Sequence, residues 1–243
     1  MEPPPKKIEG VAMAAYLLPP TSTPKLGLNM PIQLAVSQRK RWRRKSPFGA
    51  PLEDYAMAEC YGFRAPQVLV ALWCGMVGGG GLFCEGIFRL APDASESAAV
   101  ERLLLKGRLE KGHPVVLAHL IKKFLRELPG GLLGSAPTAT IRSCGAASTG
   151  VGCSQGAKDQ LVESLSPSAA HTLQWLVRII SLTQECRGRN KMNLRNLALV
   201  IAPNLFGPAA GSNANPIEEL QRVEVATNAL HSLVSAVPSE TDS

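Results

Sequence analysis

The sequence has few of the residues that build metal centres and disulfide frameworks. Its 243 residues include four histidines and six cysteines, and the cysteines form no Cys-x-x-Cys pair. The histidines lie too far apart in the chain for a metal-ligand set, which excludes the common zinc patterns. Several cysteines fall in apolar stretches, where a reduced thiol packs as a small hydrophobic group. We therefore expect an intracellular protein with neither disulfides nor a metal site.

Long hydrophobic runs are also missing from the chain. The apolar stretch VAMAAYLL at 11–18 is too short to cross a bilayer, which takes about 20 apolar residues. It does not lead into a small-residue cleavage site, so we do not expect a signal peptide. These two features predict a cytoplasmic location.

The body of the chain lacks a basic excess, although the net charge is +7 and the sequence pI is 9.3. Residues 1–46 carry nine basic and two acidic side chains, whereas residues 47–243 carry 17 of each. The pI therefore describes the N-terminal segment. Because the body is neutral and the three tryptophans form no stacking array, we expect no nucleic-acid partner.

The first 46 residues have the composition of a disordered segment. Prolines recur in MEPPP, LLPPTSTP and NMP without an apolar period, which is typical of disorder. The run QRKRWRRK then concentrates six cations around a tryptophan. Such a cluster can bind anionic lipid at about 1 kcal/mol per residue, can act as a nuclear import signal, or can be a solvated tail. Its residues are Arg39, Lys40, Arg41, Trp42, Arg43, Arg44 and Lys45.

Apolar residues recur at helical spacing through most of the remaining chain, and no run alternates at period two for long. These patterns predict an all-α helical bundle over 47–238, followed by a short tail at 239–243. The stretch 130–156 is rich in glycine, serine, alanine and threonine, and we predict a flexible insertion there. Helices are predicted at 65–77, at 92–107 with Ser95 as N-cap, at 113–128, 158–165, 166–186, 191–203 and 215–234.

One arginine lies in a segment that otherwise looks like core. In EGIFRL, Arg89 stands between Phe88 and Leu90, and burying an unpaired guanidinium costs much free energy. Two interpretations follow. Arg89 forms a salt bridge with a nearby carboxylate, Glu85 or Asp93, or it projects toward an anion that belongs to another molecule.

Two predicted helices carry further polar groups that a buried helix does not need. Lys122 and Arg126 are like charges at i, i+4, which costs a helix a few tenths of a kcal/mol. They either complement the negative C-terminal end of the helix or face an acidic partner. Asn196 falls in a strongly apolar helix, where asparagine is a poor interior residue. Its amide either bonds inward to a loop or faces another chain.

Three blocks of the sequence together resemble the Rho GTPase-activating (RhoGAP) domain. They are EGIFRL, LIKKFLRELP and NKMNLRNLALVIAPNLF, in this order, and the resemblance covers roughly residues 47–238. The wording WCGMVGGGGLFCEGIFR is similar to the plant-type Rho/Rop activators in particular. The resemblance implies a RhoGAP-type helical bundle that is not itself an enzyme but activates a Rho, Rac, Cdc42 or Rop-type small GTPase in trans. It implies no cofactor of its own, because GTP and Mg²⁺ belong to the partner GTPase.

The resemblance also implies roles for the four residues singled out above. Arg89 matches the arginine finger that enters the partner's active site and stimulates GTP hydrolysis. Lys122 and Arg126 match a basic pair that contacts the GTPase and shapes the surroundings of the finger. Asn196 matches an asparagine that hydrogen-bonds across the interface. The alternative is a catalytically silent module of the same fold that binds GTPases as a scaffold, and the presence of Arg89 favours the activator.

Two departures from the family pattern concern the surface that selects among GTPases. RELPGGLL lacks the acidic-proline ending common after the Leu-Pro, and the stretch 130–156 replaces a segment that is often more helical. Neither departure touches Arg89.

Overall fold

The computed structural model describes most of the chain from residue 46 onward. The described residues are 46–106, 109, 113–145, 153–207 and 216–237. The basic cluster at 39–45 and the predicted tail at 239–243 lie outside them, so both stay predictions.

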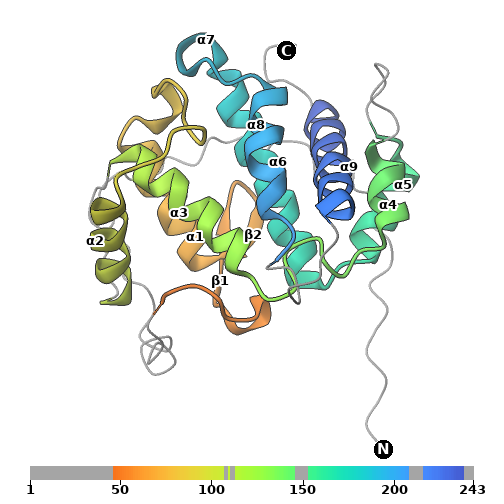
Figure 1. The fold of residues 1–243 in the computed structure, drawn as a ribbon, viewed down its shortest axis with the longest axis horizontal. Helices are drawn as coiled ribbons and strands as arrows, with labels where there is room; N and C mark the ends of the chain where they lie inside the picture. The colour runs from red at the N-terminus through yellow and green to blue at the C-terminus, as the bar shows by residue number, and fades with distance from the viewer. Residues whose placement is uncertain (1–45, 107–108, 110–112, 146–152, 208–215, 238–243) are drawn as a thin grey trace, which may run out of the picture.

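Helices dominate the described residues, which confirms the predicted fold class (Figure 1). Short 3-10 helices η3, η4 and η5 cover Leu52–Asp54, Gly81–Phe83 and Ala202–Asn204. The α-helices are α1 (Gln67–Gly78), α2 (Ala94–Leu105), α3 (Pro114–Glu127), α4 (Thr138–Gly145), α5 (Gln155–Glu163), α6 (Pro167–Glu185), α7 (Arg187–Asn190), α8 (Leu194–Ile201) and α9 (Pro216–Ser235).

A small β-hairpin precedes α1, where the sequence analysis expects no strand. Strands β1 (Met57–Cys60) and β2 (Phe63–Pro66) pair antiparallel. The two residues between them, Tyr61 and Gly62, both have positive φ, as a type I′ hairpin turn requires. Each strand has four residues, which is too short for an alternating pattern to stand out from a helical one.

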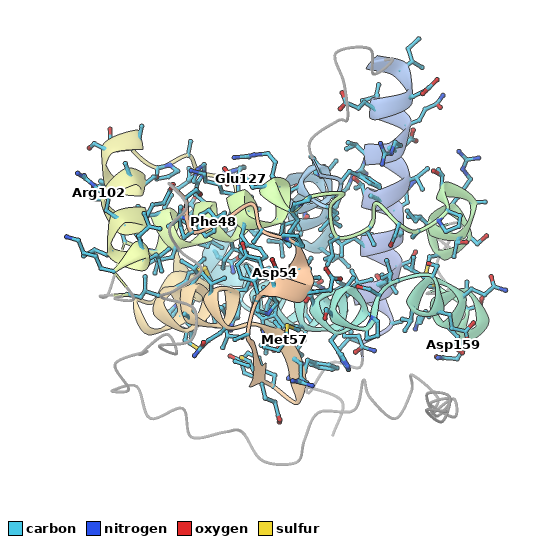
Figure 2. All side chains as sticks on the ribbon, turned by 90° about the horizontal axis from the view of Figure 1, so that it is seen from below. Phe48, Asp54, Met57, Arg102, Glu127 and Asp159 are labelled. Carbon is cyan, nitrogen blue, oxygen red and sulfur yellow. The ribbon has the colours of Figure 1, made fainter. Side chains whose placement is uncertain are left out.

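In the core, α1 packs on α3, and α6 packs on β2. Four apolar residues at helical spacing, three in α3 and the fourth its C-cap, are buried and form one stripe. Trp73 of α1 meets Trp175 of α6 edge-on, with ring centroids 6.5 Å apart. Figure 2 shows Phe48 beside α3 near Glu127, and its ring packs edge-on against Phe124 at 5.9 Å. The stripe residues are Leu117, Ile121, Phe124 and Leu128.

A second layer covers the other side of α6. Figure 1 shows α9 between α6 and the α4–α5 pair, and α4 packs closely on α9. This contact has little room: a Cβ atom added to Gly145 would come within 2.9 Å of the Asn228 Cβ and of the Ala229 backbone nitrogen. The N-terminal turns of α9 extend beyond the neighbouring helices in Figure 2.

The stretch 130–156, predicted as a flexible insertion, contains α4, and its described part packs on the rest of the fold. Leu132, Leu133, Ile141 and Cys144 are buried, and the Leu133 N–H donates to the Leu205 carbonyl at 2.9 Å. The Sγ atoms of Cys144 and Cys153 lie 2.8 Å apart and connect the end of α4 to the start of α5. The small residues of this stretch allow close packing on α9. Residues 146–152 lie outside the described part.

Two further properties can be read from the described ranges. Their helices do not combine the length and the apolar content that a membrane span needs. They also contain no group of three histidine, cysteine, aspartate or glutamate residues placed to hold a metal ion.

Candidate functional site

The loop that carries Arg89 is built to turn its side chain outward. Ile87 and Phe88 are buried, with exposed fractions of 0% and 2%, whereas Arg89 is exposed. The loop turns at Gly86 and Phe88, whose φ angles are +70° and +66°. A positive φ is unfavourable for phenylalanine, by roughly 1–2 kcal/mol, and such strain tends to occur at functional sites. The buried Phe88 ring anchors this loop, hereafter the finger loop (Gly86–Leu90).

The Arg89 guanidinium has no hydrogen-bond or ion-pair partner among the described residues. The predicted alternative, a salt bridge to Glu85 or Asp93, is therefore not formed. Asp93 is the N-cap of α2 and accepts hydrogen bonds from the backbone of Ser95 and Glu96. Bonds from the Ser95 hydroxyl and from these N–H groups lower the pKa of Asp93. The prediction of Ser95 as the N-cap is thus wrong, because α2 begins at Ala94 and the Asp93 side chain accepts the N–H groups of its first turn.

Backbone hydrogen bonds fix the conformation of the finger loop around Arg89. The N–H groups of Arg89 and Leu90 both donate to the Gly86 carbonyl, at 2.8 and 3.0 Å. The N–H of Gly86 donates in turn to the Asn190 carbonyl at 2.9 Å. The finger loop is therefore a hydrogen-bonded turn that is attached to Asn190 at the end of α7.

Lys122 contacts the finger loop from α3. Its ammonium donates a hydrogen bond to the carbonyl of Phe88, the residue before Arg89. Lys122 is partly buried, and this burial is the main cause that lowers its pKa. The positive charge of Arg126 lowers the pKa further. A hydrogen bond from a charged donor is roughly twice as strong as a neutral one. Lys122 thus supports the finger loop through a backbone carbonyl, a partner that neither the helix-end nor the acidic-partner interpretation includes.

Arg126 lies one turn further along α3 and is exposed. Its Nη1 donates to the Asn204 Oδ1 at a long 3.4 Å. The Asn204 amide donates to the carbonyls of Val200 and Ile201, at 3.0 and 3.3 Å. Arg126 therefore reaches from α3 to the junction of α8 and η5 and keeps much of its surface open.

Asn196 lies in the first turn of α8. The helix predicted over 191–203 would instead place it near the middle. The helix begins at Leu194 because Asn193 is its N-cap and accepts a hydrogen bond from the Asn196 N–H at 2.8 Å. The Asn196 side chain is half-buried, and its amide has no hydrogen-bond partner in the described part of the chain. The inward bond to a loop is thus not formed.

The structure adds apolar and cationic residues that the sequence analysis missed. Phe83 in η4 is 51% exposed, and the Arg189 guanidinium lies over its ring, 4.5 Å from the centroid. Leu90 and Leu199 are also large exposed hydrophobic residues. The position of Phe83 two residues after the glycine run 78–81 was the available signal. Four further residues of the segment from α7 to α8 are exposed cations: Arg187, Arg189, Lys191 and Arg195.

The family models and the curated proteins give the same match. The model of the RhoGAP domain family matches residues 66–210. The chain is 32% identical over 190 residues to Rho GTPase-activating protein gacA of Dictyostelium discoideum, covering 77% of this chain and 53% of that protein. It is 32% identical over 182 residues to Rho GTPase-activating protein 1 of Arabidopsis thaliana, covering 74% and 37%. The chain thus spans about half the length of these relatives, or less.

Solved structures show the same fold. Human Rho GTPase activating protein 15 is similar with a TM-score of 0.56 at 18% identity, covering 82% of this chain and 98% of that one. The BH domain from GRAF, the GTPase regulator associated with focal adhesion kinase, has a TM-score of 0.50 at 17% identity and covers 71% and 97%. At these identities the likeness concerns the fold.

Proposed function

Because this chain belongs to the RhoGAP domain family, we propose that it accelerates GTP hydrolysis by a Rho-family small GTPase and so switches off signalling by that GTPase. Arg89 acts in trans as an arginine finger. The GTP and Mg²⁺ of the reaction belong to the partner, and the partner class is that of Rho, Rac, Cdc42 and Rop proteins.

The observation that carries this proposal is the exposed, unpaired guanidinium on a tightly held loop. Arg89 has no partner among the described residues, and its loop is fixed by the Phe88 ring, the Gly86 turn and Lys122. A cation on a preorganised loop stabilises developing charge without having to reorganise at the moment of reaction.

An arginine supplied in trans offsets the charge that develops on the transferring phosphoryl group. This contribution is typically 10³–10⁵-fold in rate, or roughly 4–7 kcal/mol of transition-state stabilisation. Lysine is a weaker substitute because it lacks the planar fork of several donors.

The other site residues divide between support and contact. Lys122 positions the finger loop through the Phe88 carbonyl. Arg126 and Asn196 present polar groups that are exposed or half-exposed, and they contact the GTPase surface. The exposed Arg189, whose guanidinium lies over Phe83 just before the finger loop, adds positive charge there, which favours an acidic partner surface and raises the association rate.

Single-turnover GTP hydrolysis tests the proposal on a panel of GTP-loaded Rho, Rac, Cdc42 and Rop proteins. The wild-type chain should stimulate at least one of them, and Arg89→Ala should lose about 10³–10⁵-fold of that stimulation. Affinity for the GTPase bound to a non-hydrolysable GTP analogue should be retained. The matched control is Arg142→Ala, which removes an exposed arginine from α4 and should behave as the wild type.

The same experiment distinguishes the scaffold alternative. A scaffold would bind GTP-loaded GTPases and leave their hydrolysis unchanged, with or without Arg89. If Arg89→Ala stimulates as well as the wild type, the finger mechanism is wrong.

A further inference from the structure

We propose that Asn190 is the positioning residue of the finger loop, so that its buried side chain sets the stimulated rate of hydrolysis without touching the GTPase. This inference rests on the proposed function. Asn190 ends α7, between Arg189 and Lys191, and its exposed fraction is 0%.

The Asn190 amide connects three segments, one of which, at Leu82, lies 108 positions away in the sequence. Its Nδ2 donates to the Leu82 carbonyl at 2.9 Å and to the Thr183 carbonyl at 2.8 Å. Its Oδ1 accepts the Met192 N–H at 2.8 Å. One side chain thus holds η4, the last turns of α6 and the entry to α8 in a fixed arrangement, and both of its donor hydrogens are used.

The Asn190 backbone connects this junction to Arg89. Its carbonyl accepts the Gly86 N–H at 2.9 Å, and the Gly86 carbonyl accepts the Arg89 N–H at 2.8 Å. The path from the amide to the finger therefore has two backbone hydrogen bonds. Lys122 holds the opposite side of the finger loop through the Phe88 carbonyl.

No other side chain of similar size offers the same set of bonds. The side chain donates to two carbonyls, of Leu82 and Thr183, and accepts the Met192 N–H, which is the hydrogen-bonding capacity of an asparagine amide. Aspartate has the same shape but would set a carboxylate oxygen against two carbonyl oxygens. Asn190→Asp should therefore release η4 from α6 and let the Gly86 turn shift.

Because Asn190 is buried, a substitution there can affect the partner GTPase only by moving the finger loop. A displacement of a catalytic group by about 1 Å can cost on the order of 10²-fold in rate. We expect Asn190→Asp to lower the kcat of stimulated hydrolysis by about 10- to 100-fold and to leave KM for the GTP-loaded GTPase unchanged. Affinity for the GTPase bound to a non-hydrolysable GTP analogue should also be unchanged.

The experiment compares wild type, Asn190→Asp, Asn190→Ser and Arg89→Ala in multiple-turnover assays on a GTPase that the wild type activates. The control is Ser166→Ala, which removes the N-cap at the opposite end of α6 and should lower Tm without changing kcat. Circular dichroism and Tm establish that each variant is folded. If Asn190→Asp does not fold, Asn190→Ser, which keeps one donor, makes the same comparison with a smaller loss of kcat.

A double variant provides the readout that a merely structural role would not produce. If Asn190 acts through Arg89, adding Asn190→Asp to Arg89→Ala should lower kcat no further. Equal losses of kcat in both backgrounds, or a loss confined to KM, would overturn the inference. A wild-type kcat in Asn190→Asp would overturn it while leaving the proposed function intact. A wild-type chain that stimulates no GTPase of the panel would overturn both.

Discussion

The two flanks of α3 carry neighbouring lysines with opposite surroundings. Lys123 pairs with Glu101 of α2 at 2.6 Å and with Glu127 at 3.8 Å. Its ammonium also lies 5.9 Å from the Phe48 ring centroid. Lys122, one residue earlier, donates to the neutral carbonyl of Phe88.

The flank with Lys122 and Arg126 has no carboxylate partner within the described residues, so its charge stays uncompensated. The flank with Lys123 is neutralised and joins α2 to α3. A lysine's role in this protein thus depends on the charge of its partner. The charge that has no carboxylate partner among the described residues lies beside the finger loop.

The largest effect within this comparison should come from Lys122→Met. It removes a charged donor from the Phe88 carbonyl, and a hydrogen bond to a charged group contributes about 1.5–3 kcal/mol. We expect the kcat of stimulated hydrolysis to fall roughly 10- to 100-fold, measured against Lys123→Met as the matched control. Equal kcat values for the two variants would refute the distinction between the flanks.

Arg126→Ala should have a smaller effect, on KM. Arg126 is exposed, and an exposed ion pair with a partner contributes at most about 1 kcal/mol, which corresponds to about fivefold in KM. The salt dependence of association should also weaken, because a cation at the rim of an interface acts mainly on the association rate. Stopped-flow binding at several ionic strengths measures both. An unchanged salt slope would place Arg126 outside the interface.

Lys123→Met should reduce stability and spare activity. Its ion pairs are partly exposed, at 24% and 18% for Lys123 and Glu101, so we expect a loss below about 1 kcal/mol. That corresponds to a decrease in Tm of about 2–4 °C at most. Differential scanning calorimetry measures it, and Glu101→Gln should give a similar decrease. A large loss of kcat in Lys123→Met would contradict the structural role.

The smallest effect should be a pH dependence from His119, which lies between the flanks on α3. Burial, and then the charge of Lys122, lower the pKa of His119 from 6.5. The unfolded chain therefore binds more protons than the folded one, and stability falls as pH falls through 6.5 toward the lowered pKa. Comparing Tm between pH 7.5 and pH 5 should show a shallower decline for His119→Gln than for wild type. Parallel curves would exclude His119 as the cause.

Helical periodicity predicted the elements whose burial depends on local spacing. The stripe of α3 is buried as expected because 3.6-residue periodicity aligns Leu117, Ile121 and Phe124 on one face. The pattern failed where elements are short or rich in small residues. The hairpin before α1 has too few residues to alternate visibly. Helix α4 has only eight residues, and packing on α9 stabilises it.

The candidate site shows the same division. Three sequence blocks predicted the four site residues Arg89, Lys122, Arg126 and Asn196. The partners of these residues were not foreseen, because a contact such as Lys122 to Phe88 spans 34 positions. Asn190 was missed because a buried asparagine in a short polar segment looks like an ordinary turn residue.

The amino-acid sequence alone determined that this protein is a helical bundle, and three of its sequence blocks indicated the family. Both follow from apolar spacing and residue identity, which are local properties. Only the tertiary structure decided which cations are neutralised and which stay open. That outcome depends on which carboxylates and carbonyls the folded chain brings within hydrogen-bond reach, and no local pattern encodes those distances.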